Sequence, residues 1–287
     1  MSNVAVLERK VDDYKSEVKP TWCPGCGDFG VLNAVYNTLL RRGRNPEDIV
    51  CVSGIGCSSR FPFFVSSYGF HGIHGRATPI ATGVKTANPE LTVIVLGGDG
   101  DAFAIGGGHF LHSVRRNVDM TYIIMDNEVY GLTKGQASPT SITGYVTKST
   151  PKGTSEAPLN PIALALSTGA TFVARGFSGK PKELTELILQ GVEHKGLAVI
   201  DVYSPCPTFN SYNTFKFFRE KTVELPKDHD VHNQEAALRL AVSDDPLYLG
   251  LFYQDLDSKS FGDRVAAKMP EQIDAHAELE GLFKRFS

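Results

Sequence analysis

The sequence predicts an α/β fold with a doubly wound, mainly parallel sheet and a C-terminal extension. Short apolar, β-branched runs alternate with helical patterns through the first two thirds of the chain. Each run stops close to Gly, Asp, Asn or Cys residues. The 287 residues are 41% hydrophobic and 21% charged, which is ordinary for a soluble globular protein with a sizeable core.

Five apolar runs are predicted to be strands, because strands buried on both faces of a parallel sheet are apolar throughout. They are Asp48–Ser53, Leu91–Leu96, Met120–Met125, Thr171–Ala174 and Leu197–Val202. Helices are expected between them, at Gly30–Arg42, Pro79–Thr86, Phe103–Arg115, Pro161–Thr168 and Lys182–Lys195. Such alternation forms doubly wound sheets, in which ligands bind at the carboxyl ends of the strands.

The pattern changes in two places. Residues 138–158 are rich in Ser, Thr, Gly, Pro and Lys and are expected to form a long loop, a kind of segment that is often functional. Beyond residue 210 the alternation weakens, although a helix at Gln234–Val242 and a strand at Pro246–Tyr253 are predicted. We therefore expect one α/β unit over residues 1–210 and an extension over residues 211–287 that packs on a partner subunit.

Composition disfavours several classes of function. The formal net charge of −3, from 29 basic and 32 acidic residues, does not call for a nucleic-acid partner. No run of about 18 apolar residues is present, so no membrane span is expected. The first residues resemble no export signal, which favours a cytoplasmic protein whose five cysteines stay reduced.

Polar residues follow two successive predicted strands. Gly98-Asp99-Gly100-Asp101 comes after the second strand, and Asp126-Asn127 comes after the third. Either segment alone would be an ordinary strand-end turn. Together, Asp99 and Asn127 would face one crevice with oxygen ligands that suit Mg²⁺, while the glycines would let backbone N–H groups approach a diphosphate.

Four cysteines are spaced as ligands of one metal centre. Cys23 and Cys26 form a Cys-x-x-Cys pair, and Cys57 and Cys206 could complete a set of four thiolates. Four thiolates suit tetrahedral Zn²⁺ or a [4Fe–4S] cluster, and the spacing alone does not choose between them. The fifth cysteine, Cys51, lies inside a predicted strand and is expected to be a buried structural thiol.

The amino-acid sequences of five segments are similar to those of the β subunit of 2-oxoacid:ferredoxin oxidoreductases. The resemblance is collinear from Trp22 to about Thr208 and includes a thiamine diphosphate motif, Gly-Asp-Gly followed by Asn. The segments are Trp22-Cys23-Pro24-Gly25-Cys26-Gly27, Ser53-Gly54-Ile55-Gly56-Cys57-Ser58, His74-Gly75-Arg76-Ala77, Gly97-Gly98-Asp99-Gly100-Asp101-Ala102 and Asp126-Asn127-Glu128-Val129-Tyr130-Gly131-Leu132-Thr133-Lys134-Gly135-Gln136.

This resemblance implies a thiamine diphosphate-binding fold of the diphosphate-domain type, with three sets of site residues. Asp99 and Asn127 would bind Mg²⁺ through their side chains, and Val129 through its carbonyl oxygen. Thiamine diphosphate would be lined by Ile55, Gly56, Cys57, Ser58, His74, Gly100, Asp101, Gly131 and Leu132. The four thiolates of Cys23, Cys26, Cys57 and Cys206 would hold a [4Fe–4S] cluster and not zinc.

The implied reaction is the reversible, coenzyme A-dependent oxidative decarboxylation of a 2-oxoacid, with electrons passing to ferredoxin. One α/β unit is predicted here, so an α subunit, or α and γ subunits, would supply the carboxylate that polarises the cofactor's aminopyrimidine. A non-redox thiamine diphosphate decarboxylase or lyase is an alternative, but it would not need four placed cysteines. A zinc scaffold that binds another protein is a third hypothesis.

Arg60 bears on the choice of substrate. It follows Cys57 in a loop expected to line the cofactor, where a guanidinium could pair with a substrate carboxylate. 2-Oxoglutarate keeps a distal carboxylate that pyruvate lacks, so Arg60 favours 2-oxoglutarate, with pyruvate as the alternative. The competing interpretation is an exposed arginine, or one that pairs with the partner subunit.

Overall fold

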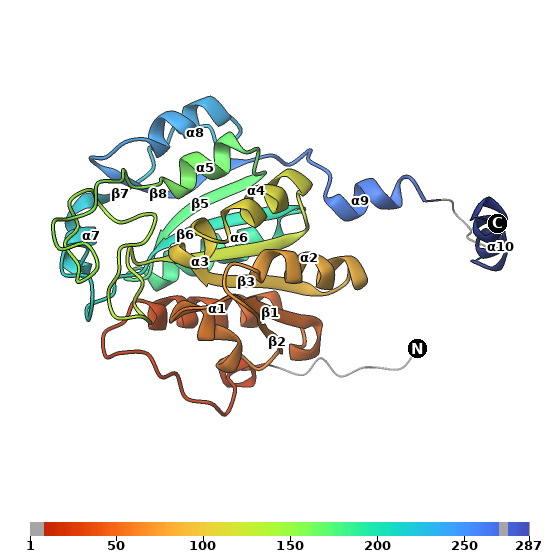
Figure 1. Ribbon diagram of the computed structural model, residues 1–287, viewed down its shortest axis with the longest axis horizontal. Coiled ribbons are helices and arrows are strands. Elements are labelled where there is room, and N and C mark those ends of the chain that lie inside the picture. The colour runs from red at the N-terminus through yellow and green to blue at the C-terminus, as the bar shows by residue number, and fades with distance from the viewer. Residues whose placement is uncertain (1–8, 270–274, 287) are drawn as a thin grey trace.

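The computed structural model describes residues 9–269 and 275–286, and an eight-stranded sheet crosses it (Figure 1). The strand order is β2-β1-β3-β4-β6-β5-β8-β7. The first six strands run parallel, whereas β8 is antiparallel to β5 and carries β7 parallel to itself. The strands are β1 (Ile49–Ser53), β2 (Tyr68–His71), β3 (Thr92–Gly98), β4 (Met120–Asp126), β5 (Phe172–Phe177), β6 (Leu197–Tyr203), β7 (Thr222–Glu224) and β8 (Leu247–Gln254).

Helices cover both faces of this sheet, which confirms the doubly wound α/β class (Figure 1). One face packs against α1 (Asp28–Arg42) and α6 (Pro181–Glu193). The other packs against α2 (Ala77–Ala87), α4 (Gly107–Arg116), α5 (Pro161–Ser167) and α8 (Gln234–Ala241). The remaining helices are η1 (Val11–Tyr14), η2 (Pro46–Asp48), η3 (Ser58–Phe63), α3 (Asp99–Phe103), α7 (Phe215–Lys221), α9 (Phe261–Ala266) and α10 (Ala275–Phe286).

The apolar runs form strands because their side chains alternate between two cores. In β3, Ile94 packs on the α1–α6 side, whereas Val93 and Val95 pack on the side of α2 and α4. On the α1–α6 side, helix α1 packs against the sheet with Val35 and Leu39, both fully buried. Burying one such side chain contributes about 1.5–3 kcal/mol, so both faces of the central strands stabilise the sheet.

Every predicted strand exists, and each lies within a few residues of its expected position. The helix predicted at Phe103–Arg115 is wrong at its start, because α3 ends at Phe103 and α4 begins only at Gly107. The backbone of Gly106 packs so closely on α3 that an added Cβ would lie 2.2 Å from the carbonyl oxygen of Asp101. This close approach breaks the helical pattern into two pieces. Strands β2 and β7 were not predicted.

The segment beyond residue 210 continues the same sheet. Strand β8 pairs with β5, and α8 packs beside α5 and β8. The sheet therefore extends past the expected boundary at residue 210. Residues 1–8, 270–274 and 287, which belong to the two predicted units, lie outside the described residues. Among the helices that the structure describes, none combines the length and the apolar character that crossing a membrane requires.

Candidate active site

A cavity of about 140 Å³ lies where β1, β3 and β4 end, at the carboxyl edge of the parallel strands. This is where a doubly wound sheet binds its ligands. All nine residues predicted to line thiamine diphosphate border it, as do the three predicted Mg²⁺ ligands. The lining residues are Ile55, Gly56, Cys57, Ser58, His74, Gly98, Asp99, Gly100, Asp101, Asn127, Val129, Tyr130, Gly131, Leu132 and Thr133.

Two neighbouring strands bring the predicted Mg²⁺ ligands together. Asp99 follows β3 and Asn127 follows β4, and these strands are paired up to Gly98 and Met125. Asp99 is buried, and burial raises the pKa of its carboxyl to about 6. A bound cation would favour the ionised form again. One carboxylate and one amide oxygen beside a glycine cradle therefore fit Mg²⁺ held together with a diphosphate.

Glycines at the cavity are required by close packing. A Cβ on Gly100 would lie 2.3 Å from Cε1 of Tyr130, and a Cβ on Gly54 would lie 2.1 Å from Oδ2 of Asp101. The hydroxyl of Tyr130 also donates a hydrogen bond to the carbonyl of Gly100, at 3.3 Å. The first residues of α3 are thus held with their N–H groups at the cavity, where the helix N-terminus favours an anion.

Asp101 fixes the loops round the cavity. Its Oδ1 accepts hydrogen bonds from the backbone N–H groups of Ile55, at 2.9 Å, and Gly75, at 2.7 Å. The same oxygen lies 2.7 Å from Nδ1 of His74. Asp101 therefore borders the cavity while its carboxylate joins the loops after β1 and β2. His74 is oriented by this contact and keeps Nε2 without a partner among the described residues.

The four predicted cluster ligands come from three segments that meet beside this cavity. The N–H of Gly27 donates to the carbonyl of Pro205 at 3.0 Å, which joins the Cys-x-x-Cys loop to the segment of Cys206. The indole Nε1 of Trp22 donates to the carbonyl of Cys57 at 2.7 Å. Two backbone-directed bonds thereby hold all three segments in one place.

Two of the four sulfur atoms lie beside the same glycine. A Cβ placed on Gly131 would lie 3.6 Å from Sγ of Cys57 and 3.7 Å from Sγ of Cys206. Burial, together with the charges of Asp28 and the neighbouring cysteines, raises the pKa of the Cys57 thiol to about 11. Thiolates in this position need a bound cation, as a metal centre would provide.

Zinc and a [4Fe–4S] cluster require different spacings of four thiolates. Within residues 9–269 and 275–286, no three His, Cys, Asp or Glu side chains are close enough to hold a single metal ion. Tetrahedral zinc, with Zn–S bonds near 2.3 Å, would need sulfur atoms roughly 3.8 Å apart. A [4Fe–4S] cluster binds each thiolate through a different iron and needs a wider set. As placed, the four cysteines do not form a single-ion site, and each would need its own iron if they hold a cluster.

Arg60 lies near Cys57, one of the predicted cluster ligands, and outside the lining of the cavity. It belongs to η3, and its charge acts to lower the pKa of Cys57 against the larger effect of burial. Arg60 is half-buried and has no ion-pair partner among the residues described. Its guanidinium thus remains available to a ligand or to a partner subunit.

Sequence reasoning missed three residues at the site. Asp28, at the start of α1, accepts a hydrogen bond from Oγ of Ser204 at 2.8 Å, and burial raises its pKa to about 6. Tyr130 packs on Gly100, and Thr140 contacts Asp99. Tyr130 lies in a matched motif and Asp28 directly follows one, but the motifs gave neither residue a role. Only the Ser- and Thr-rich composition of its loop pointed to Thr140.

The fold and the glycine-cradled Asp–Asn crevice define a thiamine diphosphate-binding enzyme domain. Residues 54–202 match the family model of the C-terminal thiamine pyrophosphate-binding domain of thiamine pyrophosphate enzymes, the same cofactor under another name. Residues 206–268 match the C-terminal part of the pyruvate ferredoxin oxidoreductase beta subunit. The second match includes Cys206 and the strands β7 and β8.

Individual relatives extend this result over most of the chain. The β subunit of 2-oxoacid:ferredoxin oxidoreductase 2 from Aeropyrum pernix is 42% identical, with 94% of this chain and 93% of that one covered. The 2-oxoglutarate oxidoreductase subunit KorB of Mycobacterium tuberculosis is 48% identical over 75% of this chain and 58% of its own length. The chain belongs to the β subunits of 2-oxoacid:ferredoxin oxidoreductases and is thus an oxidoreductase subunit.

A solved structure agrees in detail. In the 2-oxoglutarate:ferredoxin oxidoreductase from Magnetococcus marinus, a chain 45% identical in sequence superposes with a TM-score of 0.91. The alignment covers 96% of each chain. That enzyme was solved with 2-oxoglutarate, coenzyme A and succinyl-CoA bound.

Proposed function

We propose that this chain, joined to an α partner, catalyses the coenzyme A-dependent oxidative decarboxylation of 2-oxoglutarate and reduces ferredoxin. The observation that carries the proposal is the position of Cys57. It borders the cofactor cavity and also stands with Cys206 beside Gly131. A thiamine diphosphate site and an electron-transfer site would therefore share one wall, which a non-redox decarboxylase or lyase does not need.

The residues of the cavity would hold the diphosphate half of the cofactor. Asp99, Asn127 and the carbonyl of Val129 would bind Mg²⁺, while the glycine-rich start of α3 would receive the diphosphate. When bound, thiamine diphosphate supplies an electron sink for decarboxylation, and a [4Fe–4S] cluster carries electrons outward. His74, held by Asp101, would present Nε2 to the diphosphate.

The α subunit would dock on exposed apolar side chains at the cavity rim and along the edge of the sheet. The cavity rim carries Leu132, which is 51% exposed, and the edge strand β2 carries Tyr68, which is 63% exposed. Contiguous exposed apolar surface is typical of protein interfaces. Helix α10 adds a stripe at helical spacing, formed by Leu279, Leu282, Phe283 and Phe286. The extension would contribute this stripe to the same assembly.

The choice of 2-oxoglutarate depends on Arg60 and on the relatives. Arg60 offers a guanidinium that has no ion-pair partner among the described residues and lies near Cys57, and the distal carboxylate of 2-oxoglutarate is a matching partner. Several relatives carry 2-oxoglutarate in their names, and the solved homologue binds it. Pyruvate is the second candidate, because the matched C-terminal family is that of pyruvate ferredoxin oxidoreductase.

Anaerobic turnover by the assembled enzyme tests this proposal. The chain would be co-expressed with its α partner and supplied with thiamine diphosphate, Mg²⁺, coenzyme A and ferredoxin. We expect ferredoxin reduction that requires coenzyme A and has a higher kcat/KM for 2-oxoglutarate than for pyruvate. A higher value for pyruvate would reverse the substrate assignment, and decarboxylation without ferredoxin reduction would favour the non-redox alternative. Full turnover by this chain alone would contradict the need for a partner.

A further inference from the structure

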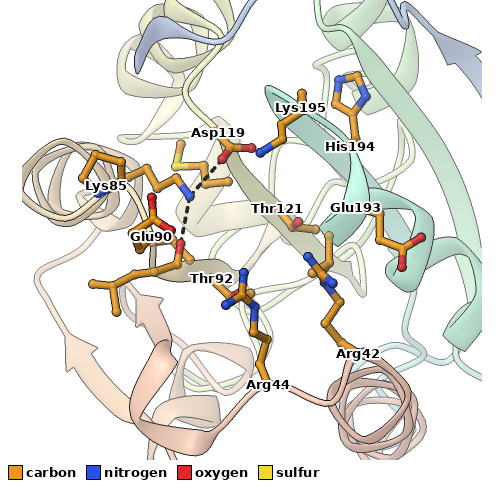
Figure 2. A pocket seen from close by; sticks show the side chains of 15 residues that line it. Arg42, Arg44, Lys85, Glu90, Thr92, Asp119, Thr121, Glu193, His194 and Lys195 are labelled. Carbon is orange, nitrogen blue, oxygen red and sulfur yellow. Dashed lines mark hydrogen bonds and ion pairs between the residues drawn. The ribbon is translucent and has the colours of Figure 1, made fainter. Parts of the chain in front are cut away.

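A second pocket lies at the opposite edge of the sheet, where the parallel strands begin. Its floor is formed by the first residues of β3 and β4, and its walls come from the C-terminal ends of α1, α2 and α6 (Figure 2). Its volume is about 130 Å³. Since β3 has seven residues at roughly 3.3 Å each, about 20 Å separate this pocket from the cofactor cavity. The two sites are therefore distinct.

Two arginines point into this pocket side by side. Figure 2 shows Arg42, from the last turn of α1, and Arg44, from the following loop, extending together toward its centre. Neither guanidinium has a hydrogen-bond or ion-pair partner in the described part of the chain, and Nε of Arg42 is buried without one. Two like charges directed into one partly buried space repel each other unless an anion lies between them.

Arginines near a helix C-terminus often serve only to cap it. That explanation does not account for these two. The carbonyls of Leu39 and Leu40 at the end of α1 accept from the N–H of Gly43, at 3.0 and 3.2 Å. The nearby acidic residue Glu186 pairs with Arg41 instead. The guanidinium groups of Arg42 and Arg44 are thus left for a ligand.

The acidic residues round the pocket do not cancel this charge. Asp119 forms an ion pair with Nζ of Lys85, at 2.9 Å, and accepts a hydrogen bond from the N–H of Gly196, at 3.3 Å. Glu90 and Glu193 are exposed. At the floor, the side chain of Thr121 is almost fully buried, and its hydroxyl has no hydrogen-bond partner among the residues described. The centre of the pocket therefore offers two cations and an unused hydroxyl.

We propose that this pocket binds the phosphate group of a small phosphorylated ligand. Guanidinium groups bind phosphate oxygens in pairs, and a threonine hydroxyl can donate to a third oxygen. Pockets that enclose whole drug-sized ligands measure about 300–1,000 Å³, so this smaller pocket suits one phosphate group with the remainder of the ligand outside. The site is independent of the proposed reaction at the other edge of the sheet.

Titration calorimetry with inorganic phosphate tests the site in the assembled enzyme. Saturation with thiamine diphosphate and Mg²⁺ first blocks the cofactor cavity. We expect phosphate to bind, and the single variants Arg42→Ala and Arg44→Ala to weaken it by about 10- to 100-fold, as for a lost charge-assisted contact. Arg41→Ala is the matched control, because Arg41 is exposed and paired with Glu186. No phosphate binding, or equal binding by all three variants, would overturn the proposal.

A second measurement needs no variant. Phenylglyoxal modifies arginine side chains, and mass spectrometry of the wild-type enzyme identifies the labelled residues. Phosphate should slow the labelling of Arg42 and Arg44 and leave that of Arg41 unchanged. Equal labelling with and without phosphate would contradict the site, as would closure of the pocket by the partner subunit, which would leave both arginines unlabelled throughout.

Discussion

The hydroxyl of Thr140 lies 2.8 Å from Oδ2 of Asp99, so the loop after β4 supports the predicted Mg²⁺ ligand. The same hydroxyl lies 2.8 Å from Oδ1 of Asp126. A hydroxyl has one hydrogen, so it can serve both carboxyl groups only if one of them is protonated. Burial and neighbouring acids raise the pKa of Asp126 well above its usual value, which favours protonation of Asp126 and leaves Asp99 as the acceptor of the Thr140 hydrogen bond.

Replacing Thr140 should therefore weaken cofactor binding. Thr140→Val keeps the shape and removes the hydrogen bond to Asp99, a charge-assisted contact worth about 1.5–3 kcal/mol. We expect thiamine diphosphate to bind about 10- to 100-fold more weakly at a fixed Mg²⁺ concentration, measured by calorimetry. Thr140→Ser, which keeps the hydroxyl, should bind nearly as the wild type does. Unchanged affinity in Thr140→Val would show that the hydroxyl does not position Asp99.

Loss of Cys57 should remove the iron centre. Cys57→Ser replaces a thiolate with a hydroxyl, which is a poor iron ligand, so iron content and ferredoxin reduction should both fall sharply. Cys51→Ala is the control, because Cys51 is fully buried in β1 and is not a predicted ligand. Iron analysis of anaerobically purified protein measures both variants. Full iron in Cys57→Ser, with loss in Cys51→Ala, would exchange the two assignments.

Arg60→Ala should change substrate preference. Removing a guanidinium that binds the distal carboxylate would lower kcat/KM for 2-oxoglutarate about 10- to 100-fold and leave that for pyruvate nearly unchanged. The measurement compares both acids with the partner subunit present, and Arg41→Ala provides a control for the loss of a distant exposed cation. If the ratio of kcat/KM for 2-oxoglutarate to kcat/KM for pyruvate is the same in the variant as in the wild type, Arg60 does not bind the distal carboxylate.

A buried ion pair behind the site should contribute strongly to stability. Nε of Arg175 donates to Oδ2 of Asp201 at 3.0 Å across the paired strands β5 and β6, and both side chains are buried. Asp201→Ala would leave a buried, unpaired guanidinium and should cost about 3–5 kcal/mol in urea unfolding. Glu186→Ala, which breaks the exposed pair with Arg41, should cost under about 1 kcal/mol. Similar losses in the two variants would contradict this account.

The sequence predicted those parts of the molecule that local pattern determines. The central strands are apolar on both faces, so β3 and β4 could be placed, and the polar residues at their ends followed. Strand β2 was missed because all four of its residues are exposed, and an edge strand has no apolar run. Neither Thr140 nor the pair Arg42 and Arg44 could be assigned, because folding alone brings each beside partners distant in sequence.

The central claim is that one subunit carries thiamine diphosphate and a [4Fe–4S] cluster at adjoining positions. Iron analysis and visible spectroscopy of the anaerobically purified, assembled enzyme test it most directly. We predict about four iron atoms per chain and a visible absorption that bleaches on addition of 2-oxoglutarate and coenzyme A. A colourless protein with stoichiometric zinc, or iron that the 2-oxoacid does not reduce, would contradict the account.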